Sequence, residues 1–217
     1  MKASRGAVLG VLGIVAAGAF LIARTVDIPL LRLVAKPLPV LALAGLVFHS
    51  ERDRYSAWVV GGLVLGALGD LLLELGDSTF LAGVAAFLVA HLCYIAAFMR
   101  RRPLPMWPRA IPLVIFGGLV FTALRPTLGG MTAPVAAYTA AICVMGWRAL
   151  ALLGRGDGRD TWFAAAGALA FIASDTILAF NRFSEPIAGA GYSIILLYWL
   201  GQLGIAASAW DHSRARG

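Results

Sequence analysis

The sequence predicts an all-α, polytopic membrane protein with eight transmembrane helices. Of its 217 residues, 60% are hydrophobic and only 13% are charged, and the mean hydropathy is +0.85. A soluble domain has no core large enough to bury so much apolar surface. The apolar residues also form eight runs of 17 or more, and each run is long enough to cross a bilayer as a helix.

The eight runs follow one another through short connections, so the whole chain, 1–217, is expected to be one integral membrane domain. The runs lie at about 7–23, 30–49, 57–75, 80–99, 108–124, 133–153, 161–181 and 187–209. The first run follows Lys2 and Arg5 and has the outline of a signal peptide, but the residues before Arg24 offer only a weak cleavage site. An uncleaved first helix is therefore expected.

Basic residues gather in the connections that an eight-helix chain places on one side of the membrane. This side has Lys2, Arg5, Arg52, Arg54, Arg100, Arg101, Arg102, Arg109, Arg155, Arg159, Arg214 and Arg216, with Arg148 at the end of its helix. The opposite side keeps Arg24, Arg32, Lys36, Arg125 and Arg182. The positive-inside rule then places both termini in the cytoplasm. The net charge of +7 is explained by these topology anchors, so nucleic-acid binding is not expected.

Two carboxylates lie inside apolar runs. Asp70 is in the third run and Asp175 in the seventh, and an acid at the centre of a membrane helix costs roughly 2.5 to 3.5 kcal/mol, which favours a functional role. Each acid follows a glycine by eight positions, since Gly62 precedes Asp70 and Gly167 precedes Asp175. The matched spacing predicts two parallel four-helix repeats, about 1–103 and 104–217, whose acids face each other.

Other polar residues are expected near the level of this pair. Both acids lie five or six residues before the outer ends of their runs, roughly 8 Å below the outer interface. Lys36, near the start of the second run, falls at a similar depth, where it is either a snorkelling anchor or a partner of the acids. Glu74 shares a helix face with Asp70 but lies nearer the headgroups, as a solvated acid or a site residue. Asn181 and Arg182, one to two turns after the second acid, are placed to hold a phosphate at the outer interface.

The fourth and eighth runs carry polar side chains at helical spacing. His91 and Tyr94 share one face of the fourth run, and Tyr198 and Gln202 are four residues apart in the eighth. A lone histidine in an apolar run is usually a hydrogen-bonded core residue. The polar pair at the equivalent place in the second repeat favours a shared polar site instead.

Two carboxylates brought together in an apolar interior cannot both ionise easily. One then stays protonated while the other is a base. This arrangement suits hydrolysis through acid protonation and activation of water, and it equally suits proton-coupled transport. Cys93 and Cys143 lie inside apolar runs and form no disulfide or metal-ligand motif, so no metal and no cofactor is expected.

In their order and spacing, these residues resemble the YhhN/TMEM86 family of membrane proteins, whose animal members are lysoplasmalogenases. The resemblance covers nearly the whole chain. It rests on Lys36-Pro37, Gly69-Asp70, the segment 80–83, Phe87, Ala90-His91, Tyr94, Gly167, Phe171, Ser174-Asp175, Asn181, Phe183, Tyr198 and Gln202. One departure is Gly66, where a small polar Ser is expected in many members.

The resemblance implies hydrolysis of the vinyl ether bond of lysoplasmalogens to a fatty aldehyde and a glycerophospho-base, with Asp70 and Asp175 as catalytic residues. Protonation of the β-carbon gives an oxocarbenium ion that water attacks, and two carboxylates suffice for such chemistry in glycosidases. The expected substrate-binding residues are Lys36, Glu74, His91, Tyr94, Asn181, Arg182, Tyr198 and Gln202. The expected partners are a lysophospholipid with an alkenyl chain and the lipid bilayer, with the head group near Lys36 and Arg182.

Two other functions use a pair of intramembrane acids. An aspartyl protease requires a Tyr-Asp motif, whereas Ser174 precedes Asp175. A proton-coupled carrier of a small solute or lipid is the alternative to the hydrolase, since repeats and acids within the membrane are its features too. The carrier is disfavoured because no Gly/Pro pair interrupts the third or the seventh run.

Overall fold

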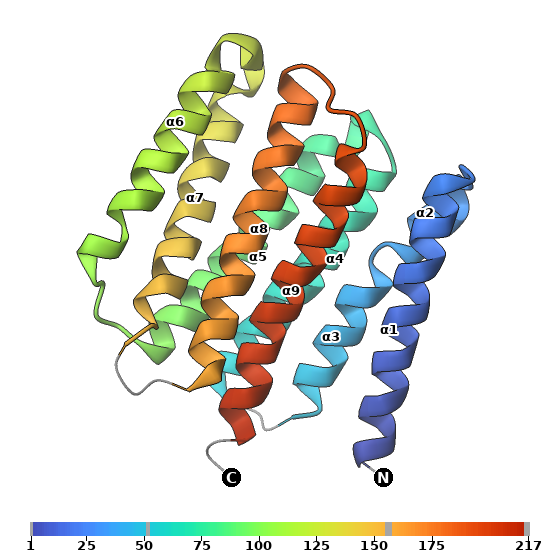
Figure 1. Cartoon of the computed structure of the whole chain (residues 1–217), viewed down its shortest axis with the longest axis vertical. Coiled ribbons are helices and arrows are strands. Elements are labelled where there is room, and N and C mark those ends of the chain that lie inside the picture. The colour runs from blue at the N-terminus through green and yellow to red at the C-terminus, as the bar shows by residue number, and fades with distance from the viewer. Residues whose placement is uncertain (1, 51–52, 155–157, 215–217) are drawn as a thin grey trace.

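The computed structural model describes residues 2–50, 53–154 and 158–214. Over these residues it has nine α-helices and no strand (Figure 1). The helices are α1 (Lys2–Thr25), α2 (Pro29–Ala35), α3 (Leu38–Phe48), α4 (Arg54–Glu74), α5 (Phe80–Arg101), α6 (Ile111–Leu128), α7 (Thr132–Ala151), α8 (Arg159–Phe183) and α9 (Ala190–Arg214). Each of the eight predicted apolar runs is therefore helical.

The second run, predicted as one helix over 30–49, is divided in the structure. It forms α2 and α3, with Lys36 as the C-cap of α2 and Pro37 as the N-cap of α3. Pro37 and Pro39 have no N–H to donate to the preceding turn, so a continuous helix would lose two hydrogen bonds here. Lys36 consequently lies at a helix break.

Seven helical stretches of the described chain are long and apolar enough to cross a membrane. One of them, Trp107–Ala151, contains both α6 and α7, which turn back on each other and lie antiparallel (Figure 1). Large apolar side chains are exposed along many helices, including Val11, Leu30 and Leu119. Exposure on this scale is typical of surfaces that face lipid, so the chain is a multi-pass membrane protein. The count of eight spans stays a prediction.

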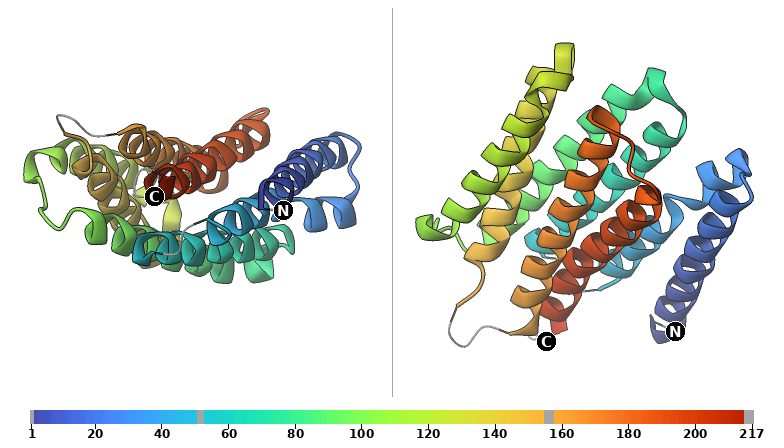
Figure 2. Two further views of the ribbon diagram at one scale, coloured as in Figure 1. Left: turned by 90° about the horizontal axis from the view of Figure 1, so that it is seen from below. Right: turned by 45° about the horizontal axis from the view of Figure 1, so that its top comes forward.

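Two helix pairs make the most extensive contacts: α4 with α5, and α8 with α9. Seen end on, α8 and α9 lie across α3, α4 and α5, with α6 and α7 at one side and α1 and α2 at the other (Figure 2). Gly62 leaves room for Tyr94 of α5, whose ring would lie 2.2 Å from a Cβ at that position. Gly167 lets the backbone of α9 approach, since its Cβ would lie 2.7 Å from the carbonyl oxygen of Gly201. Both glycines of the matched spacing thus serve close packing against the next helix.

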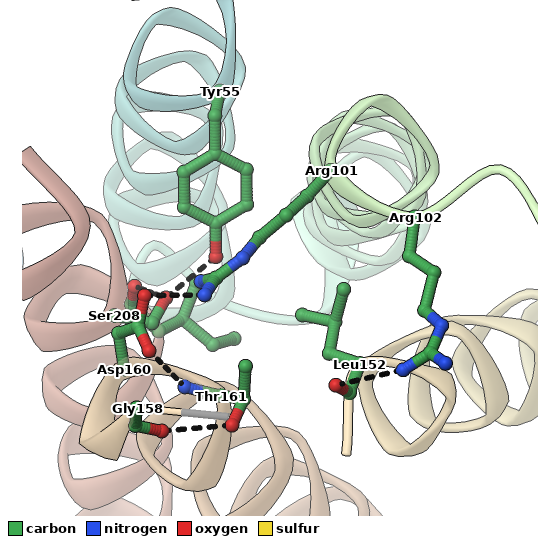
Figure 3. Close-up of polar contacts among 9 residues, drawn as sticks. Tyr55, Arg101, Arg102, Leu152, Gly158, Asp160, Thr161 and Ser208 are labelled. Atoms are coloured by element: carbon green, nitrogen blue, oxygen red, sulfur yellow. Dashed lines mark hydrogen bonds and ion pairs between the residues drawn. The ribbon is translucent and has the colours of Figure 1, made fainter. Parts of the chain in front are cut away.

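A buried polar cluster lies at the end of the bundle where the chain begins and ends (Figures 1 and 3). Arg101 of α5 forms an ion pair with Asp160 of α8, which also accepts a hydrogen bond of 2.9 Å from the backbone N–H of Thr161. The hydroxyl groups of Tyr55 and Ser208 lie 2.7 Å apart and join α4 to α9. These contacts hold together the same four helices that carry the polar interior.

Candidate functional site

Asp70 is the last acceptor in a series of buried hydrogen bonds that runs from α5 through α9 to α4. Tyr94 donates its hydroxyl proton to Oε1 of Gln202 at 2.6 Å, and Nε2 of Gln202 donates to the hydroxyl oxygen of Tyr198 at 3.2 Å. Tyr198 in turn donates to Oδ2 of Asp70 at 2.7 Å. Each hydrogen bond of this series is donated in the direction of Asp70, which is only 2% exposed. This direction stabilises the ionised form of the carboxylate.

Gly66 explains how this chain of hydrogen bonds fits against α4. A Cβ at position 66 would lie 2.5 Å from Nε2 of Gln202 and 3.3 Å from the hydroxyl oxygen of Tyr198. The glycine therefore opens the space that the amide occupies.

Asp175 has a different environment. Its Oδ2 accepts a hydrogen bond from the hydroxyl of Tyr138 in α7. Both residues line a cavity between α5, α6, α7 and α8, which we call the apolar cavity. Apolar side chains make up most of its wall, among them Phe87, Val120, Leu124, Val135, Ile142 and Ile172, and Arg182 contributes a cation. The apolar cavity has the lining that an aliphatic chain requires.

A series of ring contacts connects the tyrosine partners of the two acids. The ring of Phe171 makes edge contacts with Tyr198, at 5.3 Å between centroids, and with His91, at 4.9 Å. The His91 ring also contacts Tyr138, at 5.1 Å. The structure thus brings both acids into one interior, each with its own tyrosine donor.

His91 is completely buried, yet neither ring nitrogen has a hydrogen-bond partner among the described residues. Buried polar atoms without a partner are uncommon in proteins and call for an explanation. The usual role of a lone histidine, a hydrogen-bonded core residue, does not hold here. Its contacts with Tyr138 and Phe171 place it beside the Asp175 branch of the site.

Glu74 forms ion pairs with two cations, Lys36 and Arg32. Oε2 of Glu74 lies 3.0 Å from Nζ of Lys36, and its Oε1 lies 2.6 Å from Nη2 of Arg32. The Glu74 side chain is only 8% exposed, so it is not a solvated interfacial acid.

Asn181 and Arg182 lie at the end of α8 and engage in separate contacts. Oδ1 of Asn181 accepts a hydrogen bond of 2.9 Å from the backbone N–H of Ile187. Arg182 forms an ion pair of 2.8 Å with Asp77 and lies over the ring of Phe80, 4.7 Å from its centroid. Arg182 therefore borders the apolar cavity, whereas Asn181 borders a separate polar pocket.

Sequence reasoning missed Tyr138 and Arg32. Tyr138 is a phenol in the middle of an apolar run, which is the one signal it offers. Arg32 precedes Lys36 by four residues, so the two cations share a helix face and can reach one acid. Assigning Arg32 to topology alone overlooked this spacing.

Comparisons with known proteins agree on one family. The family model described as YhhN matches residues 31–209, a range that includes every predicted site residue. The human protein named Lysoplasmalogenase TMEM86B is 37% identical over 180 residues, which cover 80% of this chain and 73% of that protein. Bovine Lysoplasmalogenase TMEM86A is 38% identical over 172 residues, 77% of this chain and 69% of the relative. The Mycobacterium tuberculosis protein named Lysoplasmalogenase is 35% identical over 170 residues, 73% and 60% of the two chains. No solved structure matches the chain significantly.

Proposed function

The chain belongs to the YhhN family, and we propose that it is a lysoplasmalogenase whose chemistry is performed by Asp70 and Asp175. The reaction hydrolyses the vinyl ether bond of a lysoplasmalogen to a fatty aldehyde and a glycerophospho-base. One observation carries the proposal for the mechanism: two intramembrane carboxylates share one interior, each accepts a hydrogen bond from a tyrosine hydroxyl, and one of them lines an apolar cavity. A cavity of this kind accommodates an alkenyl chain beside an acid.

The surroundings of the two carboxylates suggest different roles. Asp70 accepts the hydrogen bond of Tyr198, whose hydroxyl oxygen in turn accepts from the amide of Gln202, so we assign Asp70 the ionised state. Asp175 lines the apolar cavity, and among the described residues no cation forms an ion pair with it. We assign it the protonated state and the role of general acid. Such a pair of carboxyl groups with separate roles is a recurrent solution in acid–base catalysis.

The reaction then proceeds in three steps. The Asp175 carboxyl gives its proton to the β-carbon of the vinyl ether, whose π electrons form the new C–H bond and leave an oxocarbenium ion. Water attacks the α-carbon and passes a proton to Asp70, whose negative charge stabilises the cation before the attack. The hemiacetal collapses as its hydroxyl proton returns to Asp175 and the departing glycerol oxygen takes the proton from Asp70. Both acids regain their starting states.

Aldehyde release from a matched pair of lipids tests the proposed function. The purified protein in lipid nanodiscs is given either a 1-alkenyl or a 1-alkyl glycerophosphoethanolamine of the same chain length. We expect aldehyde from the alkenyl lipid alone and without any ion gradient, because the saturated ether has no double bond to protonate. Absence of aldehyde from both lipids, together with gradient-dependent uptake, would favour the proton-coupled carrier.

Tyr138 is expected to position Asp175. Tyr138→Phe removes the hydroxyl donor but keeps the ring against His91. We expect kcat to fall roughly tenfold or more with little change in KM, because Asp175 becomes a carboxylate as it gives up its proton, and this is the usual cost of losing a hydrogen bond to a charged group. The pH–rate profile should change as well, because the hydroxyl contacts a titrating acid. Tyr55→Phe is the matched control, since Tyr55 is also buried and also loses a hydroxyl partner, Ser208, but at the other end of the bundle. Equal effects of the two substitutions on kcat and on the profile would show that Tyr138 has only a structural role.

We also infer eight spans, both termini in the cytoplasm, and one domain of two four-helix repeats. The antiparallel course of α6 and α7 supports two spans in this region (Figure 1). An even number of spans agrees with the start of α1 and the end of α9 at the same end of the bundle (Figure 1). The corresponding pairs α4–α5 and α8–α9 agree with the repeats. Of the basic residues assigned to the cytoplasmic side, Arg52, Arg155 and Arg216 lie outside the described residues.

Labelling of single cysteines in intact cells tests this orientation. Asp53→Cys, ahead of α4, should react only after the membrane is permeabilised, and Thr127→Cys, near the end of α6, should react from outside. Labelling of both positions from the same side would contradict the eight-span topology.

A further inference from the structure

A polar pocket lies at the end of the bundle away from the two termini. We call it the arginine pocket, and its lining residues are Arg24, Arg32, Asn181, Ile187, Gly189, Ala190, Gly191 and Tyr192. They come from the end of α1, from α2, from the end of α8, from the connection 184–189 and from the start of α9. Its volume of about 420 Å³ exceeds what a single phosphate group needs. No acidic side chain is part of this lining.

The two arginines of the pocket differ in how their charges are balanced. Arg32 forms ion pairs with Glu74, at 2.6 Å, and with Asp27, at 2.9 Å. Arg24 forms no ion pair with any carboxylate of the described residues. The arginine pocket therefore has an excess of positive charge, which favours an anion as its ligand.

The fold holds the Arg24 guanidinium in a fixed place. It lies over the ring of Tyr192, 5.4 Å from the centroid, and the hydroxyl of that tyrosine is 3.0 Å from Oγ1 of Thr25. A Cβ at position 191 would lie 1.6 Å from Nη2 of Arg24, so only glycine leaves room for the guanidinium. The planar group is thus preorganised across the start of α9. A preorganised guanidinium matches the oxygen atoms of a phosphate group.

Asn181 adds a donor at a defined height above Asp175. Its Oδ1 is occupied by the backbone N–H of Ile187, which leaves the amide N–H₂ as the group available to a ligand. Asn181 follows Asp175 by six residues, about 9 Å along the helix axis. In an extended lysoplasmalogen, seven covalent bonds separate the phosphorus from the β-carbon of the vinyl ether, also roughly 9 Å. A lipid whose phosphate lies at the level of Asn181 therefore presents its β-carbon at the level of Asp175.

From these observations we propose that the arginine pocket binds the phosphodiester of the lysophospholipid substrate, with Arg24 as its principal cation. The inference rests on the proposed function and adds the head-group site to it. The two cations expected from the sequence to hold the head group, Lys36 and Arg182, have their charges balanced by Glu74 and Asp77. From the sequence, Arg24 is expected only to anchor the topology. It is better placed than Lys36 and Arg182 to bind the phosphate, because no carboxylate of the described residues balances its charge.

Two variants of the full chain test the proposal. Arg24→Gln removes the charge, whereas Gly191→Ala keeps the charge but displaces the guanidinium of Arg24 from its position beside residue 191. Arg125→Gln is the matched control, because Arg125 is an exposed arginine that the sequence assigns to the same side of the membrane and that borders neither pocket. The substrates are 1-alkenyl-glycerophosphoethanolamine and 1-alkenylglycerol, which share the vinyl ether but differ in the phosphate.

We expect each variant to raise KM for the phosphorylated substrate about tenfold or more, the usual contribution of a hydrogen bond to a charged group, and to leave kcat nearly unchanged. The kinetics with 1-alkenylglycerol should not change, and Arg125→Gln should match the parent with both substrates. Equal effects on the two substrates, or no effect on either, would overturn the proposal. Competition by inorganic phosphate as strong as that by 1-alkyl-glycerophosphoethanolamine would also overturn it, since the pocket would then bind a free anion.

Binding of the non-hydrolysable 1-alkyl-glycerophosphoethanolamine, measured by thermal stabilisation of the protein in detergent, separates this proposal from the proposed function. Weaker stabilisation of Arg24→Gln supports the phosphate site even if the parent released no aldehyde. Equal stabilisation of Arg24→Gln and the parent, in a protein that does release aldehyde, would overturn the phosphate site alone.

Discussion

Asp70→Asn and Asp175→Asn are each expected to abolish aldehyde release as completely as the double substitution. An amide neither gives a proton to carbon nor accepts one from water, and the mechanism requires a protonated and an ionised carboxyl at the same moment. Effects within such a catalytic unit are not additive, so the second substitution should add little. Aldehyde formation by the three purified variants, measured against the parent over several hours, checks this result.

Folding should survive both substitutions. Asn at position 70 still offers an oxygen to the hydroxyl of Tyr198, and each change removes a costly carboxylate from the membrane interior. Thermal unfolding of the variants in detergent provides the control. If a folded Asp175→Asn protein released aldehyde at nearly the parental rate, the two-carboxylate mechanism would be wrong, and His91 or Glu74 would become the next candidate for the acid.

Gly167→Ala is expected to have the largest effect on stability. Its new Cβ would lie 2.7 Å from the carbonyl oxygen of Gly201 and 2.7 Å from the backbone nitrogen of Ile205. Backbone atoms cannot rotate aside, so α8 and α9 must separate, and overpacking of this kind costs about 1 to 3 kcal/mol. Because α8 carries Asp175 and α9 carries Tyr198, activity should fall together with the unfolding temperature.

Gly118→Ala is the matched control for this substitution. Gly118 is also in a helix, but nothing lies within 4 Å of a Cβ at its position. Alanine there should leave the unfolding temperature unchanged or raise it slightly, since alanine is the better helix former. Similar unfolding temperatures for the two variants would contradict the close contact between α8 and α9.

The sequence singles out Asp70 and Asp175, because an aspartate in an apolar run has few explanations other than function. Their catalytic role stays a proposal. The matched spacing of Gly62 and Gly167 to the two acids predicts two repeats, which stay a prediction; in the structure both glycines lie at close helix contacts. Run lengths place Lys36 near the level of the two aspartates, and in the structure it forms its ion pair with Glu74, four residues after Asp70. These inferences depend on the position of a residue along its helix axis. That position follows from the residue number, because the rise per residue is constant.

The partners of the acids were harder to predict, because they depend on the rotation of each helix about its axis. In a soluble protein the apolar stripe reveals that rotation, but lipid accepts apolar side chains on every face of a membrane helix. Nothing in the run containing Tyr138 therefore shows that its phenol points to Asp175. The close approach of Arg24 to Gly191 could not be predicted either, because the two residues are 167 positions apart in the sequence.

The central claim, that a carboxyl proton goes to the β-carbon before water attacks the α-carbon, is tested most directly by hydrolysis in D₂¹⁸O. The aldehyde is reduced to the alcohol as it forms, and the masses of the alcohol and of the glycerophospho-base are measured by mass spectrometry. We expect one deuterium on the carbon next to the former carbonyl carbon and no ¹⁸O in the glycerophospho-base, because its oxygen stays with glycerol. A glycerophospho-base that contains ¹⁸O, or an alcohol without that deuterium, would contradict the proposed mechanism.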